Sequence, residues 1–235
     1  MAPRRHQPPE PATTRKQLLA AAAAVFAERG FRDSTVREIC HRAGANIAAI
    51  SYHFGDKSAL YSAVLRETAP APAGGPHATP TPGFDRLPPA QRVAHFIREF
   101  IARIAESGPD CHHSRIMARE MIEPTQALDH LVNSFIRPQH QWFQGLVREM
   151  LGTGFSDEEI RLVANSVVSQ ILFYRHCGAV IERLQGRDPL EQSNLEVLGA
   201  HITEFSLGAI RSLARSRSRS RSIPGPTRKS AKRPS

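Results

Sequence analysis

The sequence has few of the residues that mark secreted or membrane proteins. Its three cysteines, Cys40, Cys111 and Cys177, lie far apart, and no two of them have C-x-x-C spacing. This excludes a disulfide framework and favours a reducing compartment, where such cysteines are small buried hydrophobes. No stretch approaches the roughly 18 apolar residues of a membrane span, and the charged N-terminus lacks the apolar segment of a signal peptide. We expect a soluble cytoplasmic protein.

Alternating apolar and polar residues, the pattern of half-buried β-strands, are also scarce. Almost every periodic segment instead has apolar residues at helical spacing, beginning with Leu18, Leu19, Ala22, Val25 and Phe26 on one face of the first segment. The sequence therefore predicts an all-α fold.

Acidic residues are missing from the last part of the chain. Residues 214–235 hold eight basic residues and no acid, whereas residues 13–67 carry a formal charge of +3 and residues 68–213 a charge of −3. Because an Arg-Ser run repels itself and has few apolar residues, we predict that 214–235 is a disordered tail. It is either a solubilising appendage or, as we favour, an electrostatic arm for nucleic-acid phosphates.

Proline and glycine divide the rest of the chain. Residues 69–89 hold most of the prolines and glycines outside the termini and cannot form a continuous helix. We predict, besides the tail, a disordered N-terminus at 1–12, a helical domain at 13–67, a mobile loop at 68–89 and a second helical domain at 90–213.

Short polar residues before apolar periodic segments predict where the helices begin. Such side chains accept hydrogen bonds from the free amide groups of the first helical turn. Helix starts are expected at Ser34 or Thr35, at Asn46, at Asp56, and at Ser156, which forms a capping box with Glu159.

The segment 34–54 has the length and the glycine-containing turn of a helix-turn-helix. Small side chains on its second helix, Ala48, Ala49 and Ser51, would let the backbone approach base edges in a major groove about 12 Å wide. Tyr52 and His53 can reach phosphates. A plain helical hairpin in a core fits the pattern equally well, so the pattern alone leaves both interpretations open.

Three further residues of this region have separate predicted roles. Ile50 and Phe54 are expected to pack in the core. Lys57 lies in the first turn of the next helix, where free amide groups and the helix dipole already attract a phosphate, so its ammonium would add a charge contact.

Residues 14–66 resemble the DNA-binding domain of the TetR family of bacterial transcriptional regulators. TVREI, AGANIAAISYHF and the G-D-K-x-x-L-Y that follows occur in the order and spacing of the family. Further on, SRIMAREMIEPTQAL and SQILFYRHCGAVIERL resemble the C-terminal domain of the CecR-like branch.

The resemblance implies a homodimeric repressor. Its N-terminal three-helix domain would bind half of a near-palindromic double-stranded DNA operator, and its C-terminal domain would hold a pocket for an unidentified small-molecule effector and the dimer interface. It also implies a cytoplasmic, nucleoid-associated protein without a membrane partner. The residues that would face DNA are Thr35, Arg37, Ile47, Ala48, Ala49, Ser51, Tyr52, His53 and Lys57. Ile47 and Ser51 depart from the commonest family pattern, which leaves the base preference open.

Two further sets of residues are candidates in the C-terminal domain. Apolar side chains with a few polar neighbours are typical of ligand pockets, and the candidates are Phe96, Phe100, Met117, Arg119, Glu120, Met121, Trp142, Phe143 and His176. Two stripes of apolar residues also occur near the end of the domain. By pattern alone such stripes belong more often to the core of one chain than to an interface between chains. The resemblance favours a dimer interface, and its residues would be Val163, Val167, Ile171, Leu195, Leu198, Ile202 and Phe205.

Enzymatic chemistry has little support in the sequence. Cys111, His112 and His113 are metal-ligand types, but adjacent residues do not all converge on one ion, so we expect an exposed loop there and no metal. No nucleophile–base pair or phosphate-binding loop occurs, and we expect no cofactor and no catalysis. The alternative function is that of an architectural nucleic-acid-binding protein whose basic tail supplies most of the affinity.

Overall fold

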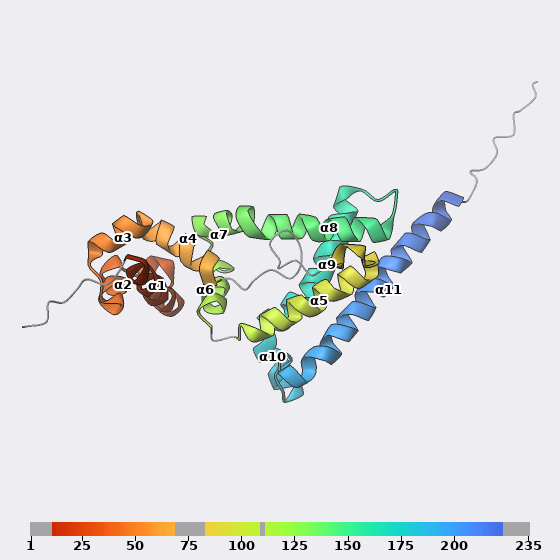
Figure 1. The fold of residues 1–235 in the computed structure, drawn as a ribbon. Helices are drawn as coiled ribbons and strands as arrows, with labels where there is room; N and C mark the ends of the chain where they lie inside the picture. The colour runs from red at the N-terminus through yellow and green to blue at the C-terminus, as the bar shows by residue number, and fades with distance from the viewer. Residues whose placement is uncertain (1–10, 69–82, 109–110, 223–235) are drawn as a thin grey trace, which may run out of the picture.

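The computed structural model describes residues 11–68, 83–108 and 111–222, and these ranges contain helices and no strand. The prediction of an all-α fold is confirmed. Four helices come first: α1 (Pro11–Asp33), α2 (Val36–Ala43), α3 (Ile47–Phe54) and α4 (Lys57–Thr68). They lie together at one end of the molecule (Figure 1).

The rest of the described chain is built from seven helices and three short helical turns. A 3₁₀ turn, η1 (Phe84–Arg86), precedes α5 (Pro89–Glu106), and a π-helical turn, η2 (Val132–Ile136), joins α7 to α8. The helices are α6 (His112–Glu120), α7 (Gln126–Leu131), α8 (Arg137–Leu151), α9 (Asp157–His176), α10 (Gly178–Gln185) and, after the 3₁₀ turn η3 (Gln192–Asn194), α11 (Leu195–Ser222).

The helices enclose two hydrophobic cores. The first gathers apolar side chains of α1 to α4 and also includes Ile116 of α6 and Ala127 of α7. The second lies among α5, α8, α9 and α11, with Phe96 and Phe143 stacked at 4.2 Å between ring centroids. Because α6 and α7 contribute to the first core, they join the N-terminal helices to the rest of the protein. The predicted domain boundaries remain a prediction.

Most of the predicted helix starts occur. Thr35 rather than Ser34 caps α2, Asn46 caps α3, and the Asp56 carboxylate accepts a 2.7 Å hydrogen bond from the amide of Ala59 in α4. The capping box of Ser156 and Glu159 opens α9. Each cap satisfies amide groups that have no partner within their own helix.

The prediction that disorder begins at residue 214 is wrong as far as Ser222, because α11 continues to that residue. Arginine is a good helix former, and Arg217 finds two partners: its guanidinium donates to Glu159 and lies 4.5 Å from the ring centroid of Phe155. The end of the tail, 223–235, lies outside the described residues, as do 1–10 and 69–82, where disorder and mobility were also predicted.

The predicted exposed loop at Cys111, His112 and His113 is also incorrect. Cys111 caps α6, and its sulfur accepts a 3.3 Å hydrogen bond from the amide of Ser114. His113 is half-buried and contacts Thr68 of α4. Cys111 and His113 thus have partners in α6 and α4, which the adjacent Gly108 and Pro109 in the sequence do not indicate.

Candidate nucleic-acid interface

Helices α2 and α3 form a helix-turn-helix whose geometry follows from three local features. The Thr35 hydroxyl accepts a 3.2 Å hydrogen bond from the amide of Glu38, and Asn46 accepts one of 3.1 Å from the amide of Ala48. Between the helices, Gly44 has φ 63° and ψ 29°, the left-handed conformation that glycine adopts without steric cost. Its amide group donates to the carbonyls that end α2. The turn is therefore fixed by the sequence itself.

Helix α3 has an inward and an outward side. Ile50 is 1% exposed and Phe54 is half-buried against the first core, as predicted. On the outward side Tyr52 is 80% exposed and Ile47 is 49% exposed. Ile47 therefore does not pack fully inward. The outward surface combines small, hydroxyl and aromatic side chains without an acid.

Most of the predicted DNA-facing residues of α2 and α3 are exposed, and we call this set the reading surface. Its exposed members are Thr35, Arg37, Ile47, Ala48, Ser51 and Tyr52. Ala49 and His53 are half-buried at its edge, and the His53 ring lies against that of Tyr52, at 4.9 Å between centroids.

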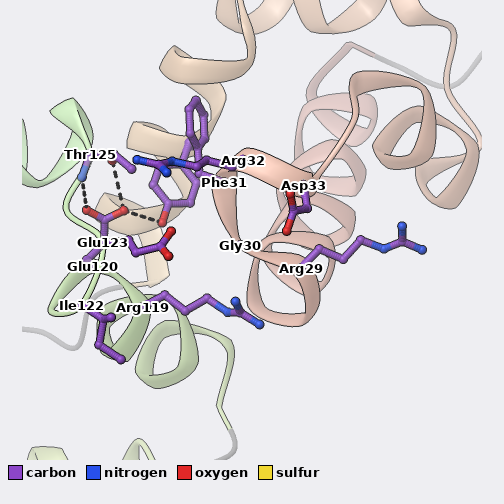
Figure 2. Close-up of a pocket in the computed structure, with 11 residues that line it drawn as sticks. Arg29, Gly30, Phe31, Arg32, Asp33, Arg119, Glu120, Ile122, Glu123 and Thr125 are labelled. Carbon is purple, nitrogen blue, oxygen red and sulfur yellow. Dashed lines mark hydrogen bonds between the residues drawn. The ribbon is translucent and has the colours of Figure 1, made fainter.

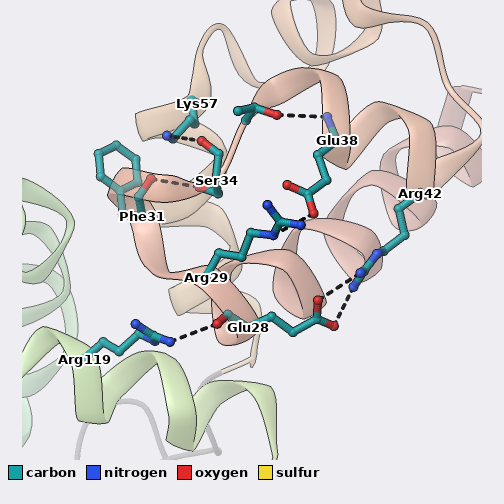
Figure 3. Close-up of polar contacts among 9 residues, drawn as sticks. Glu28, Arg29, Phe31, Ser34, Glu38, Arg42, Lys57 and Arg119 are labelled. Atoms are coloured by element: carbon teal, nitrogen blue, oxygen red, sulfur yellow. Dashed lines mark hydrogen bonds and ion pairs between the residues drawn. The ribbon is translucent and has the colours of Figure 1, made fainter.

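Lys57 departs from its predicted position. Its ammonium donates a 2.6 Å hydrogen bond to the carbonyl of Ser34 and lies 4.6 Å from the ring centroid of Phe31 (Figure 3). Burial lowers the pKa of this lysine. The side chain therefore supports the turn between α1 and α2, and the predicted phosphate contact is not favoured by this arrangement.

Ion pairs hold α2 against α1 (Figure 3). Arg42 donates two hydrogen bonds to the Glu28 carboxylate, at 2.7 and 2.9 Å, and Arg29 pairs with Glu38 at 2.9 Å. The bond from Arg42 lowers the pKa of Glu28. The sequence analysis missed these pairs, because they join residues 9 and 14 positions apart on different helices.

Helix α6 is attached to the N-terminal helices by three side-chain contacts. The Tyr61 hydroxyl donates a 2.7 Å hydrogen bond to Glu120, and the Arg119 guanidinium donates one of 2.9 Å to the carbonyl of Glu28. The third joins Thr68 Oγ1 and His113 Nδ1 at 3.3 Å. We call these three contacts the α6 junction.

A cleft of about 190 Å³ lies at the α6 junction (Figure 2). It is lined by the end of α1, by Tyr61 of α4, and by Arg119, Glu120, Ile122, Glu123 and Thr125. Gly30 forms part of its wall, and a Cβ atom added to this glycine would come within 3.4 Å of the Arg119 side chain. Its φ of 77° and ψ of 179° break the helical course of α1, as its position after the first apolar segment predicts.

The nine predicted effector-pocket residues do not line one cavity. Phe96, Phe100, Trp142 and Phe143 pack together in the second core, whereas Met117 packs against the first core. Arg119 and Glu120 line the cleft at the α6 junction, and Met121 and His176 are exposed. The prediction of a single pocket is wrong because apolar spacing along separate helices does not show which core each helix joins.

The predicted dimer residues also need correction. Val167, Ile171 and Ile202 are at most 2% exposed within a single chain, and Val163, Leu195 and Leu198 pack partly against the same second core. These six residues form the intrachain face of α9 and α11. Phe205 alone of the predicted set is exposed, at 61%.

A second apolar face of α9 and α11 is exposed to solvent. Its large side chains are Leu162, Phe173, Val197 and Phe205, each more than half exposed. We call this the outer apolar face. Only Phe205 of this face was predicted from the sequence, because apolar residues occur on both the buried and the exposed sides of α9 and α11.

Neither a metal site nor a membrane span occurs in the part of the chain that the structure describes. No three histidine, cysteine, aspartate or glutamate side chains gather there to hold an ion. None of the helices in those ranges is both long and apolar enough to cross a bilayer.

Two parts of the chain match known families. Residues 18–64 match the bacterial regulatory proteins of the tetR family, and residues 89–210 match the C-terminal domain of the HTH-type transcriptional dual regulator CecR. The first match contains α2, α3 and the reading surface, and the second contains the second core.

Individual relatives agree with these matches. The HTH-type transcriptional dual regulator CecR of Shigella flexneri is 30% identical over 198 residues, which are 80% of this chain and 87% of the relative. The HTH-type transcriptional repressor AcnR of Corynebacterium efficiens is 40% identical over 60 residues, covering 26% of this chain and 32% of that repressor.

A crystal structure of a transcriptional regulator from Pseudomonas aeruginosa PAO1 has the same fold. Its TM-score is 0.59 at 20% sequence identity, with 87% of this chain and 96% of that chain covered. The two family matches and the CecR relative show that the chain is a transcriptional regulator of the TetR family with a C-terminal domain of the CecR type.

Proposed function

We propose that the protein is a homodimeric repressor, which binds a near-palindromic operator and is released from it by a small-molecule effector. One observation carries this proposal. The reading surface exposes Ala48, Ser51 and Tyr52 on the outward side of α3, whereas Ile50 fixes the inward side in the core. Small residues allow close approach to base edges, and exposed hydroxyl groups can donate to phosphates.

The outer apolar face supports a homodimer. Large apolar side chains on two neighbouring helices are usually covered in an oligomer, and two-fold dimers are the commonest oligomers. If a second copy covers Phe173 and Phe205 through a two-fold axis, two reading surfaces are presented to one duplex. Two-fold symmetry in the protein requires a near-palindromic DNA site, with half-sites about one helical turn or a multiple of it apart.

The α6 junction gives effector binding a route to the reading surface. Arg119 bonds to the carbonyl of Glu28, and the carboxylate of Glu28 holds Arg42 of α2. A ligand that favours a shifted position of α6 would therefore act on α1 and, through the ion pair, on α2. Such a ligand can release DNA only if it binds the protein more tightly when α6 is shifted than when α6 is in its original position.

Selection of bound sites from randomised duplex DNA by the full-length protein tests the proposal. We expect the selected sequences to share a near-palindromic motif, and sedimentation of the complex to give two chains per duplex. Recovery of sequences without a common motif would contradict operator binding. A motif without two-fold symmetry, bound by one chain, would contradict the dimer but not DNA recognition.

A further inference from the structure

The last turns of α11 carry a cationic surface far from the reading surface. In Figure 1 the C-terminal end of α11 lies at the opposite end of the molecule from α2 and α3. An arm at this place does not extend the reading surface. The positive charge at the end of α11 therefore points to a partner other than the DNA at the reading surface.

Three arginines define this surface. Arg211, Arg215 and Arg219 are exposed and follow one another at intervals of four residues on α11. At 1.5 Å per residue they rise about 6 Å at each step and lie along one side of the helix. Within the part of the chain that the structure describes, none of the three forms an ion pair with a carboxylate. We call them the distal arginine row.

Arg217 holds the helix that carries the row. It is half-buried, its guanidinium donates to Glu159, and it lies 4.5 Å from the centroid of the Phe155 ring. Two residues correspond to about 200° of helical rotation, so the contact of Arg217 with the body turns Arg215 and Arg219 outward. The row is thus presented on an ordered helix.

The high positive charge of this region favours a polyanion as its partner. No acidic residue follows Glu204, whereas residues 205–235 contain nine basic residues. The phosphates of a nucleic-acid backbone form a regular line of negative charge that such a row complements.

The side chains beside the row favour DNA over a membrane surface. A helix that lies on a bilayer needs a wide apolar face with large side chains. Here Ser212, Ser216 and Ser218 stand between the arginines, and Leu213 is the one large exposed apolar residue among 211–219. Serine hydroxyl groups are frequent phosphate ligands.

We propose that the distal arginine row binds the backbone of a second DNA duplex without sequence preference, so that the protein bridges two DNA segments. This inference rests on the proposed DNA-binding function. It assigns the row to a duplex other than the one bound by the reading surface.

A capture experiment tests the bridge. A short duplex with the selected site is immobilised and saturated with full-length protein, and a labelled duplex without the site is then added. We expect the second duplex to be retained at low salt. The triple variant Arg211→Gln, Arg215→Gln and Arg219→Gln should bind the immobilised site as the original protein does but lose the second duplex. A matched control with the exposed Arg86, Arg137 and Arg187 changed to Gln should retain it.

The salt dependence gives a second measurement. Loss of three phosphate contacts should reduce the slope of log affinity for the second duplex against log salt by about 3. An unchanged slope in the triple variant would overturn the proposal. A protein ending at Ser222 tests the row separately from the remaining tail: retained capture supports the row, and lost capture would contradict it.

Other partners give different results. If the row pairs with acidic residues of a second copy, the triple variant will sediment as a monomer, which overturns the bridge. Retention of phosphatidylglycerol-containing vesicles, but not of the second duplex, would assign the row to membranes. Failure to bind the immobilised site would contradict the proposed function itself, whereas site binding without second-duplex capture contradicts only the bridge.

Discussion

The Tyr61 hydroxyl donates a 2.7 Å hydrogen bond to the carboxylate of Glu120, and this bond joins α4 to α6 in the protein interior. Glu120 is 1% exposed and also accepts hydrogen bonds from the amide and hydroxyl of Thr125, at 2.9 and 3.0 Å. Burial, and next the bond to Glu120, raise the pKa of the Tyr61 phenol above its ordinary value. The phenol therefore remains protonated and is the donor at neutral pH.

Replacement of Tyr61 by Phe should lower the free energy of unfolding by about 1–3 kcal/mol, because the buried Glu120 loses a donor. The measurement is urea unfolding followed by circular dichroism. Tyr52→Phe is the matched control: Tyr52 is 80% exposed, so its loss of a hydroxyl should leave stability unchanged. Equal effects of the two substitutions would show that the Tyr61–Glu120 bond does not stabilise the α6 junction.

His113 should make stability depend on pH. Burial, and next the nearby Arg175, lower the pKa of His113 from 6.5 to about 4. Between these values the unfolded chain binds a proton that the folded protein does not, so stability should fall as the pH decreases from about 6.5 to about 4. The loss from this one group is on the order of 3 kcal/mol at most.

The variant His113→Gln isolates this effect. Glutamine can still bond to Thr68 but does not titrate, so the pH dependence of unfolding should flatten in the same interval. The exposed His112, replaced in the same way, is the control for the effect of the substitution itself. A slope in the His113 variant equal to that of the original protein would assign the acid sensitivity to other groups.

A carboxylate on the reading surface should greatly weaken DNA binding without loss of stability. Ala48 is exposed in the first turn of α3, where the helix dipole favours a negative charge. Ala48→Glu therefore keeps the fold but opposes the phosphates, and we expect at least a hundredfold weaker binding to the selected site. Ala118→Glu, on the exposed side of α6, is the control and should bind normally. Normal binding by the Ala48 variant would exclude α3 from the interface.

The outer apolar face predicts how the dimer can be broken. Phe205→Glu should yield folded monomers in sedimentation equilibrium, because the residue is 61% exposed in one chain and supports no intrachain core. Ile122→Glu is the control, since Ile122 is 81% exposed and lies outside this face. A dimeric Phe205 variant would place the interface elsewhere.

Local chemistry made much of the first domain predictable. Asn46 and Thr35 act as helix caps through atoms within three residues of themselves, and Ile50 packs inward because it is the large apolar residue in the middle of a short helix. These features depend on neighbours in the sequence. The resemblance to a known family then favoured a DNA-facing surface over a simple hairpin.

The errors concern contacts between distant segments. Apolar residues such as Val167 and Ile202 were assigned to the interface, but they meet in the second core, because either partner would satisfy the same helical spacing. Lys57 binds the carbonyl of Ser34, 23 residues away, and Arg217 binds Glu159, 58 residues away. The composition of the sequence indicates neither partner. A phosphate contact was therefore predicted for Lys57, and a disordered tail was predicted around Arg217.

The central claim is that the outward side of α3 reads base sequence. The most direct test repeats the site selection with Ser51→Gln, which places a side chain capable of bidentate bonding to adenine at an exposed position. We expect the preferred base to change at one position in each half-site, symmetrically, while the rest of the motif is kept. A selected motif identical to that of the original protein would contradict it.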